Sequence, residues 1–137
     1  MIDFIVPTQE QIDKVTAYLE NFRDTEQEFM ENKKDSRGLT LKNSYQYRQD
    51  VREFFALLNE NEWDYLDYLS PEIRDYIKYP DKIQFATLKQ IKGILTYCLK
   101  GERYVEGHRN VMLKRGVIQE ALKRLKNLAS KEQKAYA

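Results

Sequence analysis

Apolar side chains recur every three or four positions along most of this chain, the spacing of helices that bury one face. Residues 8–11 and 87–90 each hold a threonine followed three positions later by glutamine, a capping box that opens a helix. Ser70-Pro71-Glu72 is a third opening, because serine caps well and proline suits the first helical position. Tyr79-Pro80 ends that helix. These signals predict a mainly helical protein.

The pattern predicts helices over residues 8–24, 44–58, 70–79, 87–101, 107–114 and 118–128, with Ser44 as the cap of the second. Residues 24–43 are polar and turn-prone, and here we expect a hairpin in which residues 28–30 face residues 39–41. The expected fold class is mainly α: a single compact helical domain, residues 1–137, of about five to six helices with one short β-hairpin near residues 28–41. Residues from about 129 are expected to fray.

Composition narrows the class of protein. A chain of 137 residues with 33% charged and 42% hydrophobic residues is typical of one soluble domain. No apolar run approaches the roughly 18 residues that cross a bilayer, and residues 1–7 do not resemble a secretory signal, so we expect a cytoplasmic protein. Cys98 and His108 are the sole cysteine and histidine, which leaves no internal disulfide and no expected metal site or cofactor.

Charge is unevenly distributed along the chain. Residues 1–81 carry 18 acidic and 10 basic side chains, a net charge of −8, whereas residues 82–137 carry 13 basic and 4 acidic ones, a net charge of +9. Such asymmetry occurs where a basic segment meets nucleic acid or an acidic partner. It also occurs where two halves of one domain attract each other, or where copies of a chain associate. All of these interpretations stay open.

The densest group of reactive side chains lies between Gly101 and Gly107 and continues to the histidine after it. Glycines permit sharp turns, so this segment is predicted to hold its polar groups in a defined geometry. The candidates for metal-independent phosphodiester cleavage are Arg103, Tyr104, Glu106 and His108. An arginine flanked by glutamates is more often an ion-paired helix junction, so an enzyme is not the favoured interpretation.

Ten tyrosines and one tryptophan raise the question of a binding surface, because these residues are enriched at interfaces and stack on nucleobases. They also pack the connections between helices. Together with charged residues of the second half they make up the candidate binding set: Tyr45, Tyr47, Trp63, Arg103, Glu106, Arg115 and Arg124.

The closing half of the domain-of-unknown-function 6508 family is similar to four parts of this chain: Leu95-Thr96, the segment from Gly101 to Gly107, Gly116-Val117-Ile118, and the arginine-leucine helix at 122–125. Tyr45-Gln46-Tyr47, the helix around residue 54 and the tryptophan at 63 follow in a similar order. The resemblance spans about residues 12–128. It implies a small bacterial or mobile-element protein and a fold, and it supplies no activity.

The favoured interpretation is a small cytoplasmic protein-binding or regulatory module. Nucleic-acid binding through the basic half is the first alternative, with contacts from Arg109, Lys114, Arg115, Lys123, Arg124 and Lys126. A nuclease-like enzyme is the second. No membrane partner is expected, and self-association stays open.

Overall fold

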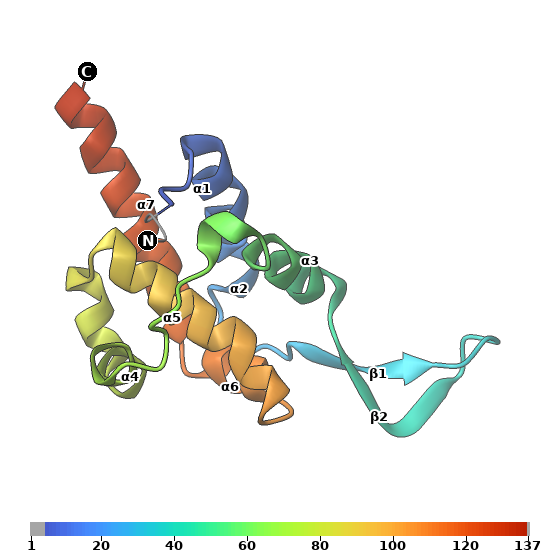
Figure 1. Ribbon diagram of the computed structural model, residues 1–137. Coiled ribbons are helices and arrows are strands. Elements are labelled where there is room, and N and C mark those ends of the chain that lie inside the picture. The colour runs from blue at the N-terminus through green and yellow to red at the C-terminus, as the bar shows by residue number, and fades with distance from the viewer. Residues whose placement is uncertain (1–4, 137) are drawn as a thin grey trace.

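Helix α5 (Leu88–Lys100) runs through the middle of the molecule, and the other helices surround it (Figure 1). Every residue from Ile91 to Thr96 is buried, so this helix is enclosed on all sides rather than along one stripe. The computed structural model describes residues 5–136, with side chains at 43, 61 and 130–136 outside the description. Within that range it is a mainly α, compact single domain with one β-hairpin.

The remaining elements follow the chain order. The helices are α1 (Gln9–Thr16), α2 (Leu19–Phe22), α3 (Gln49–Leu58), α4 (Pro71–Lys78), α6 (His108–Lys114) and α7 (Val117–Tyr136), the strands β1 (Met30–Lys34) and β2 (Thr40–Tyr47), and the 3-10 turns η1 (Asn61–Trp63), η2 (Pro80–Phe85) and η3 (Gly101–Arg103).

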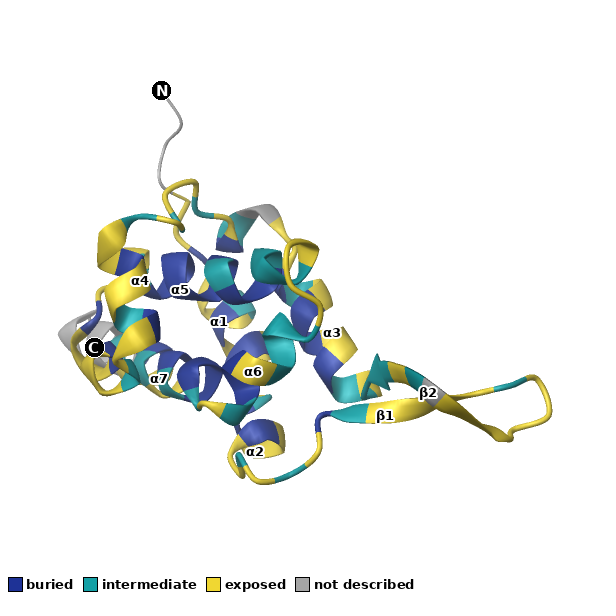
Figure 2. Ribbon diagram, turned by 90° about the horizontal axis from the view of Figure 1, so that it is seen from below, coloured by how far each residue is buried: buried dark blue, intermediate teal, exposed yellow. Residues whose placement is uncertain are grey.

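The core lies between α5, α7 and the helices that pack on them, and Figure 2 shows buried residues on the inward sides of these helices. Close to α3, aromatic rings meet edge to face: Phe22 contacts both Phe29 and Phe54, and Phe54 contacts Phe55. Edge-to-face pairs add about 0.5–1.5 kcal/mol to what burial alone contributes. This aromatic cluster fixes α2 and α3 against each other.

The strands β1 and β2 form an antiparallel hairpin that projects from the helical body (Figure 1). We call residues 30–47 the hairpin arm. Met30 pairs with Tyr47 at its base and Lys34 with Thr40 near its tip, and the register shifts between these pairs. Asp35 closes the tip, because its Oδ1 accepts hydrogen bonds from the backbone N–H groups of Arg37 (2.8 Å) and Leu39 (3.0 Å). Neither strand packs extensively on a helix.

Three local predictions were wrong. The expected pairing of residues 28–30 with 39–41 is replaced by one that reaches Tyr47, because the strand continues past Leu41 through tyrosines that alternate with polar residues. Ser44 therefore lies in β2 and caps no helix; α3 begins at Gln49. The first helix is interrupted after Thr16, whose hydroxyl donates to the Asp13 carbonyl and competes with the helical backbone.

Several predicted helix starts and ends are confirmed. Both capping boxes are formed, Ser70 accepts from the backbone of Ile73, and α5 ends at Lys100. Gly107 and Gly116 have φ values of 85° and 78°, in the left-handed region that suits glycine, and they separate α5, α6 and α7. The helix α7 extends to Tyr136, and the expected fraying near its end stays a prediction.

Candidate functional site

The segment from Gly101 to Gly107 is a junction between α5 and α6, built around the carboxylate of Glu102. Its Oε1 accepts from the Tyr47 hydroxyl (2.6 Å) and from the backbone N–H of Arg109 (2.9 Å), and its Oε2 accepts from the backbone N–H of Gly107 (2.6 Å). The Tyr47 hydroxyl in turn accepts from the backbone N–H of Asn110 (3.1 Å). These bonds satisfy donors that the start of a helix leaves free. They also fasten the base of the hairpin arm to α6.

The electrostatics of the junction agree with a structural role. Burial alone would raise the pKa of Glu102, but the hydrogen bonds from Tyr47, Arg109 and Gly107 outweigh it and hold the pKa below its ordinary value. Burial and the hydrogen bond to Glu102 raise the pKa of Tyr47 well above its ordinary value. Glu102 is therefore ionised and Tyr47 is a donor at neutral pH, and the Glu102 carboxylate is occupied by three donors.

The His108 side chain bonds to the backbone of α5 and is not among the hydrogen-bond partners of the Glu102 carboxylate. Its Nε2–H donates to the Tyr97 carbonyl (3.1 Å), and its ring lies against Gly101, where a Cβ atom would collide with it. Burial lowers the pKa of His108 below its ordinary value, so the imidazole is neutral at pH 7. This histidine packs the junction, and Gly101 is needed because the ring occupies the space of a side chain.

The four catalytic candidates are not joined into one group. Arg103, Tyr104 and Glu106 are exposed, whereas His108 is half-buried. In the described part of the chain, no side-chain hydrogen bond or ion pair links any two of these four. No acid–base pair is thus assembled between the two glycines.

Several basic side chains of the second half bind backbone carbonyls within the fold. Arg109 donates through Nε and Nη2 to the Leu99 carbonyl, and the others bond in the same way: Lys114 to Gln27 (2.6 Å), Arg115 to Ile77 (2.9 Å) and Arg124 to Ala86 (2.8 Å). The Leu99 and Ile77 carbonyls belong to the last turns of helices, where backbone oxygens lack helical partners. Ion pairs from Lys100 to Asp64 (2.9 Å) and from Lys114 to Glu28 (3.6 Å) join the basic second half to the acidic first half, so attraction between the halves accounts for part of the charge asymmetry. Lys123 and Lys126 stay exposed.

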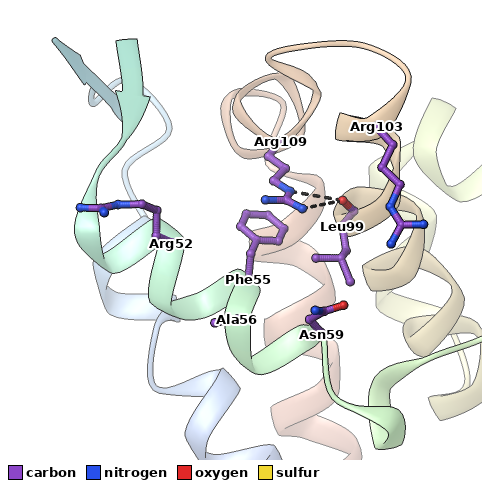
Figure 3. Close-up of a pocket in the computed structure, with 7 residues that line it drawn as sticks. All are labelled: Arg52, Phe55, Ala56, Asn59, Leu99, Arg103 and Arg109. Carbon is purple, nitrogen blue, oxygen red and sulfur yellow. Dashed lines mark hydrogen bonds between the residues drawn. The ribbon is translucent and has the colours of Figure 1, made fainter. Parts of the chain in front are cut away.

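A cleft of about 320 Å³ lies between α3, the end of α5 and the junction (Figure 3). We call it the arginine cleft, and its lining residues are Arg52, Phe55, Ala56, Asn59, Leu99, Arg103 and Arg109. Arg109 stacks over the Phe55 ring, with its guanidinium carbon 4.7 Å from the ring centroid. In Figure 3, Arg103 lies across from Arg109 on the far side of Leu99, and Arg52 extends outward from α3.

The aromatic candidates occupy three different environments. Tyr45 lies on the hairpin arm with 56% of its surface exposed, Tyr47 is half-buried at the junction, and Trp63 is 2% exposed within the core. The hydroxyl of Thr96 donates to the Trp63 backbone carbonyl (3.0 Å), which ties η1 to α5. The structure thus places only Tyr45 of these three on the open surface.

Sequence reasoning missed Arg52 and Asn59 as site residues. Arg52 lies on α3 and Asn59 is the residue that caps its C-terminal end, and with Ala56 they follow the spacing i, i+4, i+7 that lines one helix face. That stripe is exposed beside Phe55. An exposed arginine one helical turn from a small residue on an amphipathic helix was the available signal.

Within residues 5–136, no helix has the length and apolarity to cross a membrane, and acidic, histidine and cysteine side chains nowhere gather in a group of three that would hold a metal ion. A model described as a family of unknown function, DUF6508, matches residues 7–131. No curated protein and no solved structure matches the chain.

Proposed function

The chain belongs to DUF6508, a family of unknown function, and because membership supplies no activity we propose from its own residues that it is a protein-binding module whose docking element is the hairpin arm. The observation that carries this proposal is the position of the arm outside the helical body (Figure 1). The cytoplasmic, regulatory setting expected from the sequence is part of the same proposal, and the buried free thiol of Cys98 is compatible with it.

A two-stranded hairpin in water is marginally stable unless it packs on something else. Among the described strands β1 and β2 pair only with each other, so each has one unpaired edge, and such edges are templates for pairing with another chain. Its apolar side chains are also uncovered: Leu39 is 55% exposed, Leu41 39% and Tyr45 56%. A partner that covers these three side chains and pairs with one edge would stabilise the arm.

The base of the arm is fixed to the helical body by hydrogen bonds and a ring contact. Tyr47 is bonded to Glu102 and to the backbone of α6, and the backbone N–H of Arg48 donates to the Phe29 carbonyl (3.0 Å). The Arg48 guanidinium also contacts the Phe29 ring, at 5.3 Å from its centroid. A docking element fixed at its base loses less conformational freedom on binding than a free loop would.

The test compares what the intact protein and an arm variant capture from cells that produce it. Tyr45→Glu places a charge on the proposed surface, and Phe85→Glu makes the same kind of change at an exposed aromatic (74%) on η2. We expect at least one protein captured by the wild type and by Phe85→Glu to be lost from Tyr45→Glu. Identical sets from all three proteins, with unchanged melting temperatures, would contradict the proposal.

One observation favours nucleic acid as a second candidate. The arm exposes Lys33, Lys34, Arg37 and Lys42, and two-stranded ribbons enter the grooves of DNA. Fluorescence anisotropy of labelled single- and double-stranded oligonucleotides tests it. Binding through these four side chains predicts affinity that falls steeply with salt, with a log–log slope of about −3 to −4, and its loss when the four become glutamine. Absence of binding at low salt removes this candidate.

A further inference from the structure

The arginine cleft has an excess of positive charge, and no acidic side chain lines it among the described residues. Three of its described lining residues are arginines. Other arginines are engaged: Arg48 pairs with Asp50 (2.8 Å), and Arg115 and Arg124 bond to carbonyls. The side chains of Arg52 and Arg103 form no hydrogen bond or ion pair with any described residue. The two arginines therefore hold their donors ready for an outside acceptor.

Arg109 contributes to the same site from within the fold. An arginine side chain has five N–H donors, and two of those on Arg109 donate to the Leu99 carbonyl, which leaves three. Its position is fixed by that bond and by the Phe55 ring. Glu102, the acid nearest in sequence to Arg103, is occupied by three other donors. The positive charge of the cleft is thus only partly offset.

The shape and polarity of the cleft limit what fits. A space of about 320 Å³ is at the small end for ligand pockets, and it is walled by Phe55 and Leu99 with the Asn59 amide at its edge. A planar acceptor with a short apolar stem matches these groups, and arginine forks recognise planar carboxylates through two parallel hydrogen bonds. This is the side chain of glutamate or aspartate.

We propose that the arginine cleft binds a carboxylate side chain from an acidic segment of the protein that docks on the hairpin arm, with Arg103 as the principal contact and Arg109 and Asn59 beside it. The inference rests on the proposed function, because the carboxylate is taken to come from the same partner. Tyr104 and Val105, which follow Arg103 in the sequence, are exposed and offer apolar surface to the rest of the segment.

The test is a titration followed by NMR of the arginine Nε–Hε signals and the Asn59 amide signals. The probes are a capped Gly-Glu-Glu-Gly peptide, its Gly-Gln-Gln-Gly counterpart and a dinucleotide that carries one phosphodiester. We expect saturable shifts at Arg103, Arg109 and Asn59 with the glutamate peptide and none with the glutamine peptide. Arg103→Gln should raise the half-saturation concentration of the glutamate peptide at least tenfold. Lys126→Gln, which removes the same charge from an exposed position, should change that concentration less than twofold.

In this titration, three results would overturn the inference: shifts that never saturate, equal weakening of binding by both variants, or tighter binding of the dinucleotide at the same signals. The last would assign the cleft to phosphate. The proposed function fails separately, because it depends on Tyr45 and the arm. If Tyr45→Glu loses the partner and Arg103→Gln does not change binding of the glutamate peptide, the arm remains the docking element and the carboxylate site in the cleft is rejected.

Discussion

Replacing Glu102 by glutamine tests the role of the glycine-bounded segment, and the structure sets the size of the effect. A glutamine oxygen can keep the bonds from Tyr47 and from the backbone of Arg109, but its NH₂ group then faces the N–H of Gly107 at the place of a 2.6 Å bond. Hydrogen bonds to charged groups contribute about 1.5–3 kcal/mol each. Because Glu102 is only half-buried, we expect a loss of about 2–3 kcal/mol in the free energy of unfolding.

The same segment provides a matched control. Glu106 lies four residues further along and is exposed, and it makes no side-chain hydrogen bond or ion pair with the described residues. Glu106→Gln should change stability by less than about 0.5 kcal/mol. For 137 residues the unfolding entropy is about 0.29 kcal/mol/K, so Glu102→Gln should lower Tm by about 7–10 °C. Thermal melts followed by circular dichroism measure both.

The effect of pH on the stability difference between wild type and Glu102→Gln tests the same hydrogen bonds a second time. A carboxyl whose pKa is lowered in the folded state contributes stability above its unfolded pKa, about 4.3, and loses it as pH falls through the lower folded value. The gap in Tm between wild type and Glu102→Gln should therefore be full at pH 7 and shrink below about pH 4. Equal Tm values for the two glutamine variants at pH 7 would refute the structural account of this junction.

Other predictions concern the residues around that junction and the core. Gly101→Ala should destabilise the protein by about 1–3 kcal/mol, because the new Cβ collides with the His108 imidazole. Adding His108→Ala should recover part of that loss, and chemical denaturation of both single variants and the double variant measures the coupling. The imidazole signals of the sole histidine should titrate below pH 6.5 in proton NMR, and a midpoint above 6.5 would contradict its burial against Tyr97. Trp63→Ala should cost about 3–5 kcal/mol in urea denaturation, whereas a change under 1 kcal/mol would place this residue outside the core.

Much of the helical fold could be predicted because its signals are local. The capping boxes at residues 8–11 and 87–90, the start at Ser70 and the breaks at Gly107 and Gly116 each depend on a few adjacent residues. The hairpin was foreseen but its register was not. Register depends on pairing between Met30 and Tyr47, which lie far apart in sequence, and no strong two-residue turn fixes it.

The site was harder to predict because its residues acquire their roles only in three dimensions. Glu102 and Glu106 look equivalent in the sequence, and the structure separates them through Tyr47, which reaches the first from the base of a distant hairpin. Likewise Arg103 and Arg115 look alike as exposed bases. One lines a cleft, and the other bonds to the carbonyl of Ile77, 38 positions away.

The most direct test of the protein-binding account is photo-crosslinking in living cells that produce the protein. A photoreactive amino acid is placed at position 45 on the hairpin arm, and in a separate strain at position 126 on α7, both exposed. We predict a discrete protein adduct from position 45 that is absent from position 126 and is lost when Leu41→Glu is added. No adduct at position 45, or the same adducts from both positions, would contradict the account.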